Sequence, residues 1–222
     1  ALIGEVFTEE EKSLTTLYEA TLRLLGEGIW NPAETAGILT SRKLLKGGVP
    51  AVTGILSKLV EIGLIEKVPL WKTRKLRFYY RHKSPLLSLI YYLDQKFNLL
   101  DGYKPSVNAV KTALGREIQY CIGELLAEYR NGKLAYHVSP NQEVDVIILG
   151  KKKPVIAYEV KTGEITRSEA LNAIEKIHSL GIPKAGLVSL KDKPPDVPGA
   201  TETLGPKEII EITRRLIKPV SS

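Results

Sequence analysis

The stretch from Glu143 to Glu164, EVDVIILGKKKPVIAYEVKTGE, constrains the fold of this chain more than any other segment. It predicts two short apolar β-strands joined by a polar turn at residues 150–153. Charged residues interrupt both strands, because Asp145 lies in the first and Glu159 and Lys161 lie in the second. A hairpin apolar enough for the middle of a sheet therefore carries three charged residues that need an explanation.

The geometry of a hairpin brings these charges to one end of the sheet. Folding about the turn places Asp145 opposite Tyr158, or one residue to either side, so that Asp145 and Glu159 become cross-strand neighbours with Cβ atoms about 5 to 8 Å apart. Because side chains alternate along a strand, Glu159 and Lys161 share one face. The pattern thus predicts two carboxylates and an ammonium group that converge at the edge of a core.

Two chemical interpretations of this convergence are open. Two carboxylates this close repel each other unless a positive charge neutralises them, and oxygen ligands suit Mg²⁺. Such an ion can lower the pKa of a water and stabilise charge on a scissile phosphate, with Lys161 orienting the water or neutralising the transition state. The alternative is a structural ion pair at a solvated sheet end, of Glu159 with Lys161 or of Asp145 with a lysine of the turn.

The elements around the hairpin predict a mixed sheet flanked by helices. A helix over residues 110–130 and a strand over 133–140 precede it, and a helix over 166–181, a strand over 184–190 and a last helix over 205–217 follow. Apolar spacing predicts the inward faces of the first two of these helices, which are Ile118, Cys121, Ile122 and Leu125, and Ala170, Ala173, Ile174 and Ile177.

Asp145 followed by Glu159-Val160-Lys161 resembles the motif of the PD-(D/E)xK nuclease superfamily, which includes restriction endonucleases and archaeal Holliday-junction resolvases. The resemblance covers residues 109–190 and implies a restriction-endonuclease-like domain over 109–222. It implies that Asp145 and Glu159 are ligands of Mg²⁺ or Mn²⁺, with the Val160 carbonyl as a further ligand, and that Lys161 is the catalytic lysine.

The same resemblance implies a further acid from the first helix of the domain. Glu117 in GREIQYCIGELL matches this acid best and is the candidate catalytic residue on the helix. Glu124 is a weaker match. The sequence departs from the superfamily here, since Arg116 stands where related chains tend to have an aromatic or apolar residue. Val144 likewise stands where the motif has proline.

The first half of the chain predicts three helices followed by a β-hairpin. Thr8 and Glu11 have the spacing of a capping box, Asn31 and Pro32 begin a second helix, and Gly63 ends a third. Strands are expected on either side of WKTRK, residues 71–75. The apolar positions at helical spacing are Leu14, Leu17, Tyr18, Leu24 and Leu25 (with Thr21 among them), and Ile55, Leu56, Leu59, Val60 and Ile62.

This order resembles that of winged helix-turn-helix domains, over about residues 8–83. The resemblance implies a winged helix-turn-helix domain over 1–98, mostly α with a β-hairpin wing, whose trailing helix at 85–97 is apolar on nearly all sides and expected to be buried. Residues 99–108, which contain Gly102 and Pro105, are expected to be a linker.

Positive charge gathers on the predicted hairpin. Residues 67–83 hold seven lysines or arginines, no acid, and four aromatic residues. Such a surface can bind phosphates without reading sequence, although a solvated face or packing against another domain is the alternative. The candidate nucleic-acid-binding residues are Arg42, Lys43, Lys46, Thr53, Ser57, Lys58, Lys72, Arg74, Lys75 and Arg77.

Composition narrows the classes of partner and setting. The formal net charge is +7, which favours a polyanionic partner such as DNA. A single cysteine, no apolar run of about 18 residues and no signal-peptide pattern predict a cytoplasmic protein without a membrane partner. Scattered histidines and one cysteine argue against a zinc site, and the chain has no P-loop motif.

The two halves together resemble the C-terminal region of a family of archaeal P-loop ATPases, with FYYRHKSPLLSLIYYL as the shared join. The resemblance implies a P-loop ATPase domain that precedes these residues in the full-length chain, in keeping with the absence of any methionine. We expect a DNA-binding protein with Mg²⁺-dependent phosphodiester hydrolysis. An inactive DNA-binding or regulatory module and a protein-interaction tail are the alternatives, and a homodimer is left open.

Overall fold

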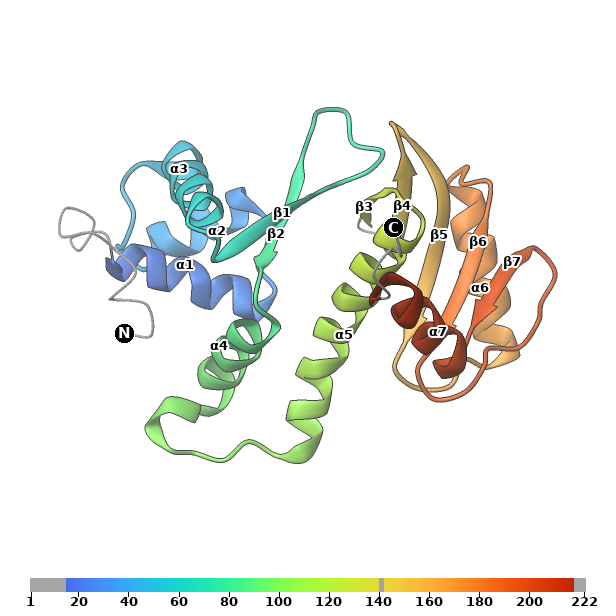
Figure 1. Cartoon of the computed structure of the whole chain (residues 1–222). Coiled ribbons are helices and arrows are strands. Elements are labelled where there is room, and N and C mark those ends of the chain that lie inside the picture. The colour runs from blue at the N-terminus through green and yellow to red at the C-terminus, as the bar shows by residue number, and fades with distance from the viewer. Residues whose placement is uncertain (1–14, 140–141, 218–222) are drawn as a thin grey trace. The chain divides into compact units, whose positions relative to one another are not determined.

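A computed structural model describes residues 15–139 and 142–217 and has a mixed α/β fold (Figure 1). The chain divides into two compact units, which we describe separately. Unit 1 comprises Ala1–Val68 and Phe78–Leu114, and unit 2 comprises Pro69–Arg77 and Gly115–Ser222. The predicted capping box of Thr8 and Glu11, and Leu14, lie outside the described residues.

Unit 1 packs helices around a leucine-rich core. Its elements are α1 (Thr15–Glu27), α2 (Pro32–Ser41), α3 (Gly48–Glu61), α4 (Pro85–Phe97) and the 3₁₀ helix η2 (Leu99–Asp101), with β1 (Ile65–Pro69) and β2 (Phe78–His82) as a two-stranded sheet. Asn31 caps α2 as predicted, because its side chain accepts the Ala33 N–H at 2.9 Å. Fully buried leucines from α1, α2 and α3 form the centre of this core, among them Leu22, Leu24, Leu39, Leu56 and Leu59.

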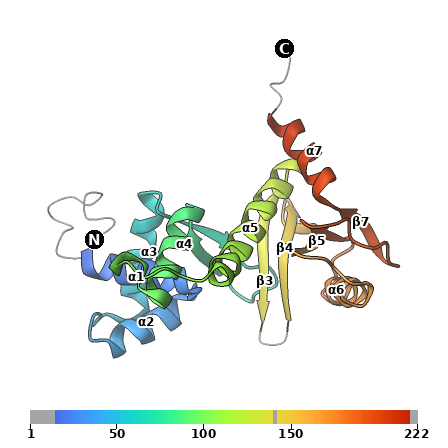
Figure 2. The same cartoon turned by 90° about the horizontal axis from the view of Figure 1, so that it is seen from below.

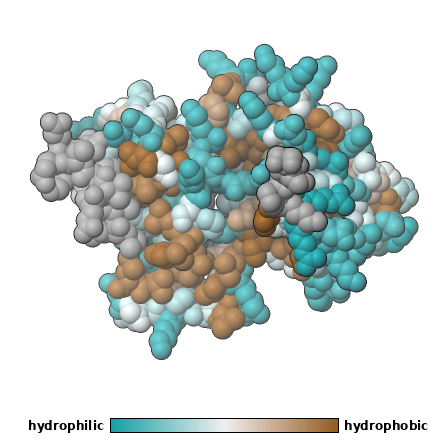
Figure 3. Space-filling model, viewed as in Figure 1, coloured by the Kyte–Doolittle hydropathy of each residue, from teal (hydrophilic) through white to brown (hydrophobic). Residues whose placement is uncertain are grey.

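Helix α4 is less buried than its composition predicts. Ser88, Tyr91, Leu93 and Asp94 are buried, but Leu86 is 66% exposed. The expected burial on nearly all sides is therefore only partial, because Leu86 is exposed and several other apolar residues of the helix are half-buried. Figure 3 shows the resulting apolar surface over the α4 region of unit 1.

Unit 2 is built on a five-stranded mixed sheet in the order β3-β4-β5-β6-β7. The strands are β3 (Lys133–Ser139), β4 (Gln142–Gly150), β5 (Lys153–Lys161), β6 (Ala185–Ser189) and β7 (Ala200–Leu204). The first three pair antiparallel, and β5, β6 and β7 pair parallel. Strand β7 was not predicted, because its sequence ATETL follows a proline-rich loop and carries little apolar signal.

Helices cover both faces of this sheet (Figure 2). Helix α6 (Arg167–Ser179) packs on one face through the predicted residues Ala170, Ala173, Ile174 and Ile177. Helices α5 (Val107–Tyr129) and α7 (Pro206–Ile217) pack on the other face, through Ile122 and Leu126 and through Ile209 and Ile212, respectively.

The inward face of α5 differs from the predicted one. Cys121 was expected on the inward face of α5 but is exposed, since Ile122 and Leu126 define that face instead. Within the described ranges, no helix has the length and apolar character that crossing a bilayer requires.

Gly186 is a packing-critical position on β6. It pairs with Tyr158 of β5, and an added Cβ would lie 2.4 Å from the Tyr158 ring. That ring is fully buried, so it has no room to move. We expect Gly186→Ala to destabilise the protein by about 2 kcal/mol, in the range of overpacked cores. Urea unfolding measures the change.

Gly115→Ala is the matched control for this substitution. Gly115 lies in α5, and nothing is within 4 Å of an added Cβ there. Alanine in a helix interior should stabilise by up to about 1 kcal/mol. Equal effects of the two substitutions would show that the Tyr158 contact does not limit this core.

Candidate functional site

The site begins where β4 and β5 part. Their ladder runs from the pair Gly150 and Lys153, around the predicted turn, to the pair Val146 and Tyr158. Beyond that pair, Oδ2 of the Asp145 side chain accepts the Val160 N–H at 2.9 Å. In a continued ladder, a backbone carbonyl of the partner strand would accept this N–H. Asp145, which interrupts an otherwise apolar strand, thus satisfies a backbone N–H where the ladder ends.

A β-bulge gives Asp145 this position. On the other side of β4, Ala135 pairs with Ile147 and His137 pairs with Val144, so three steps on β4 match two on β3. Bulges re-aim side chains locally. Asp145 lies within this irregular segment and turns toward the end of β5.

Glu159 and Lys161 point to the face of the sheet that α6 covers. The two neighbours that alternate with them on β5, Tyr158 and Val160, belong to the opposite core beneath α5 and α7. Glu159 and Lys161 line a pocket of about 210 Å³ whose other wall is α6 and the residues before it. The remaining lining residues are Ile165, Glu169, Asn172, Ala173 and Lys176.

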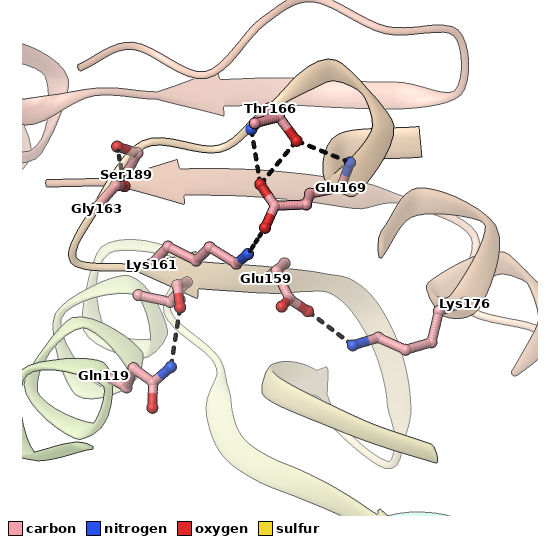
Figure 4. A network of polar contacts seen from close by, with 9 residues as sticks. Gln119, Glu159, Lys161, Gly163, Thr166, Glu169, Lys176 and Ser189 are labelled. Carbon is pink, nitrogen blue, oxygen red and sulfur yellow. Dashed lines mark hydrogen bonds and ion pairs between the residues drawn. The ribbon is translucent and has the colours of Figure 1, made fainter. Parts of the chain in front are cut away.

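Each of these two strand charges meets an opposite charge on α6 (Figure 4). Lys176 Nζ lies 2.8 Å from Glu159 Oε2, and Lys161 Nζ lies 2.5 Å from Glu169 Oε1. We call these four residues the charge quartet. The ion pairs considered from the sequence, of Glu159 with Lys161 or of Asp145 with a turn lysine, differ from the pairs found, because the partners come from α6.

Asp145 and Glu159 are close enough to influence each other strongly. Burial raises the pKa of the Asp145 carboxyl from 3.8 to about 7, and the negative charge of Glu159 adds to this rise. The Val160 N–H and the charge of Lys176 act in the opposite direction. The negative charge of Glu159 therefore acts on the Asp145 carboxyl, and the two groups together favour a bound proton or a cation.

Glu169 holds Lys161 from the first turn of α6. Its Oε2 accepts the Thr166 N–H at 2.9 Å and the Thr166 hydroxyl at 2.8 Å, which completes a capping box. The hydrogen bond from Lys161, followed by those from Thr166, lowers the pKa of Glu169 to about 2. The Thr-x-x-Glu spacing at residues 166–169 was the sequence signal for this residue, although it indicates only the cap.

From α5, Gln119 reaches the end of β5. Its Nε2 donates to the Val160 carbonyl at 2.9 Å, the carbonyl expected to be a metal ligand. Nothing in the sequence distinguished Gln119, since a single glutamine in a helix forms no pattern. Glu117 lies two residues earlier, about 200° away around the helix.

Glu117 has a different environment from Asp145 and Glu159. It is buried, and its Oε1 lies 3.3 Å from Arg116 Nε, while Glu124 is exposed. Over residues 15–139 and 142–217, no three or more His, Cys, Asp or Glu side chains are grouped as metal ligands. Mg²⁺ often uses one or two carboxylates and retains water, so Asp145, Glu159 and the Val160 carbonyl are a suitable donor set.

The tip of the β1–β2 hairpin is part of unit 2. Trp71 donates its N–H to the Tyr136 carbonyl at 2.8 Å, and Leu70 forms a parallel bridge with Tyr136 of β3. Lys72 Nζ donates to the Leu180 carbonyl at 3.2 Å. Lys72 is one of the predicted nucleic-acid-binding residues, and its ammonium group already donates a hydrogen bond within the chain.

The other basic residues of the hairpin differ in exposure. Arg74, Lys75 and Arg77 are exposed. Arg81, which the sequence placed in the same basic cluster, is buried and pairs with Glu66 at 2.8 Å. Arg81 is thus part of the fold and does not contribute to a basic surface.

The candidates in unit 1 lie between α2 and α3 and along α3. Arg42, Lys43 and Lys46 are exposed between α2 and α3, and Thr53 and Ser57 are exposed on α3. Two of the α3 candidates have internal partners. Thr53 Oγ1 donates to the Val49 carbonyl at 3.0 Å, and Lys58 Nζ lies 3.7 Å from Glu61.

Comparison with known proteins gives no match to a family model, a curated protein or a solved structure. The indication of function lies in the candidate site itself. Its distinctive features are two mutually repelling carboxylates at an opened strand pair, a lysine on the same strand, and α6 side chains that pair with both charges.

Proposed function

We propose that this chain binds DNA and that Asp145, Glu159 and Lys161 form a divalent-metal-dependent site for phosphodiester hydrolysis in a PD-(D/E)xK nuclease-like domain. The observation that supports this most is the parting of β4 and β5 at Asp145, which brings two carboxylates together beside Lys161. A purely structural hairpin would not require two like charges at that point.

The residues of the site have separate roles in this proposal. Asp145, Glu159 and the Val160 carbonyl would hold the cation, and Gln119 steadies that carbonyl. A bound Mg²⁺ or Mn²⁺ supplies positive charge at the scissile phosphate and promotes ionisation of water. Lys161 would leave Glu169 and donate to a non-bridging phosphate oxygen, where negative charge develops as water attacks phosphorus and the P–O bond to the sugar breaks. The attacking water would release a proton to solvent, and the leaving sugar oxygen would take a proton from solvent to become a hydroxyl.

The basic residues would deliver DNA to this site. In unit 1, α1, α2 and α3 followed by β1 and β2 have the order of a winged helix-turn-helix. The exposed cations lie between α2 and α3 and on the hairpin tip, at positions suited to phosphate contacts. This supports binding to DNA with little sequence preference.

Incubation of the protein with supercoiled and branched DNA tests the hydrolytic part of the proposal. Nicked or linear products are expected with Mg²⁺ or Mn²⁺ and not with EDTA. Intact DNA under all of these conditions would contradict hydrolysis, while leaving DNA binding to be measured separately.

One observation favours a second function, that of a catalytically inactive DNA-binding or regulatory module. The charge quartet satisfies Glu159 and Lys161 within the chain. This alternative includes action beside a P-loop ATPase domain of the same full-length protein, as the sequence resemblance implies. It predicts salt-sensitive DNA binding without cleavage, unchanged by Asp145→Ala.

Neutralising the exposed cations of the hairpin tip should weaken DNA binding. Replacing Arg74, Lys75 and Arg77 with glutamine removes up to three phosphate contacts, and each contact contributes about 0.9 to the slope of log K against log salt concentration. We expect a slope smaller by about 2 to 3 and an affinity lower by about 10- to 100-fold. Fluorescence anisotropy over a salt series measures both.

The turn of the β4–β5 hairpin offers a matched control. Lys151, Lys152 and Lys153 are also exposed, and they lie at the far end of the strands from Asp145. The triple glutamine variant of this turn should bind as the wild type does. Equal losses in the two triple variants would mean that net charge, and not the hairpin tip, determines binding.

A further inference from the structure

Lys176 occupies a special position in the site. It lies on α6 two turns after Glu169, and its Nζ is 2.8 Å from Glu159 Oε2. Both side chains are largely shielded from water, with 29% of Lys176 and 18% of Glu159 exposed. No pattern in the sequence distinguishes Lys176, since it is one lysine of an amphipathic helix.

The carboxylate pair needs a positive charge when no metal is bound. Two partly buried negative charges destabilise each other, and removing the positive partner of such a charge leaves it without compensation. Lys176 is the ammonium group that contacts Glu159, and its charge also acts on Asp145. It thus supplies, from within the chain, the charge that a divalent cation would bring.

The Lys176 ammonium group and a divalent cation would compete for the Glu159 carboxylate. The carboxylate that accepts from Lys176 is a ligand of the proposed metal site, so each positive partner reduces the other's interaction with it. Lysine has a flexible four-carbon stem, and Lys176 borders the open pocket beside Asn172. The side chain can therefore turn toward solvent without disturbing α6.

We propose that Lys176 is a built-in counter-ion of the Asp145–Glu159 pair, which exchanges with the divalent cation and so sets its affinity. This inference rests on the proposed function, because it requires a metal at that pair. In the absence of metal, Lys176 keeps the end of β5 folded. When the cation binds, Lys176 gives up Glu159.

Lys176→Met tests the exchange, since methionine keeps an unbranched stem of similar length and removes the charge. Mn²⁺ binding to the whole chain, without DNA, is followed by electron paramagnetic resonance of free Mn²⁺. We expect the variant to bind Mn²⁺ about tenfold more tightly than the wild type. Its melting temperature should be lower in EDTA and rise more on adding Mn²⁺, because a ligand stabilises the fold in proportion to its affinity.

Two further variants secure the comparison. Lys207→Met changes an exposed lysine of α7 and should leave Mn²⁺ affinity unchanged. Lys176→Gln also removes the charge but can still donate a hydrogen bond to Glu159, so it serves if the methionine variant does not fold. It should bind Mn²⁺ more tightly as well.

The outcomes separate this inference from the proposed function. Tighter Mn²⁺ binding with lower metal-free stability supports the exchange. If the charge-removed variant binds Mn²⁺ as tightly as the wild type or more weakly, the exchange is wrong. The proposed metal site is not contradicted by that result. Absence of Mn²⁺ binding in both overturns the metal site and the exchange together.

Discussion

The Glu159→Gln variant is expected to lose metal-dependent DNA cleavage by about 100- to 1000-fold and to bind DNA as tightly as the wild type. The substitution keeps the shape of the side chain but removes one of the two negative charges proposed to hold the cation. Losing one preorganised electrostatic contribution typically lowers a rate by such a factor. Cleavage of supercoiled DNA and anisotropy titrations, on the same preparations, measure the two properties.

Glu175→Gln is the matched control. Glu175 is exposed on α6, next to Lys176, and it is not among the residues that line the pocket. Its amide variant should cleave DNA at the wild-type rate. If Glu159→Gln still cleaves at that rate, hydrolysis does not occur at this site. If wild type and both variants all bind without cleavage, the chain is the inactive DNA-binding module.

The Asp145→Asn variant is expected to be more stable than the wild type above pH 7, by up to about 4 kcal/mol in EDTA. Burial and the charge of Glu159 raise the pKa of Asp145 from 3.8 to about 7 in the folded state. Between pH 3.8 and about pH 7, Asp145 of the folded protein keeps a proton that it has released in the unfolded chain. The free energy of unfolding therefore falls as pH rises through this range and stays reduced above it. Each unit of pKa displacement corresponds to about 1.4 kcal/mol.

An amide at this position removes the effect without losing the local contact. Its oxygen can still accept the Val160 N–H that Asp145 accepts at 2.9 Å, and its NH₂ group can donate to Glu159. Urea unfolding at pH 5 and pH 8 measures the change, with the exposed Asp192→Asn as control. A variant less stable than the wild type at pH 8 would show that the charge of Asp145 stabilises the fold. Cleavage should be lost in parallel, as expected when a stabilising change removes a functional charge.

The hairpin and the inner face of α6 follow from sequence because periodicity encodes them directly. The turn at residues 150–153 and the four inward residues of α6 are where alternation and helical spacing place them. The turn and the lengths of the strands also place Asp145 and Glu159 at the same end of the hairpin. These are local relations, which a single sequence contains.

The partners of the charges do not follow from sequence, because they depend on how α6 lies across the sheet. Glu169 and Lys176 look like ordinary helix residues until α6 is packed, and Gln119 is one polar side chain among several on α5. The bulge at Asp145 is invisible as well, since one additional residue leaves no pattern. The docking of Trp71 on β3 depends on a strand more than sixty residues away.

A crystal of the wild-type protein soaked in Mn²⁺ tests the central claim most directly. The anomalous difference map should show one strong peak within coordination distance of the Asp145 and Glu159 carboxylates, with Lys176 turned away from Glu159. A map without a peak at that pair, at Mn²⁺ concentrations that saturate other sites, and with Lys176 still bound to Glu159, would contradict it.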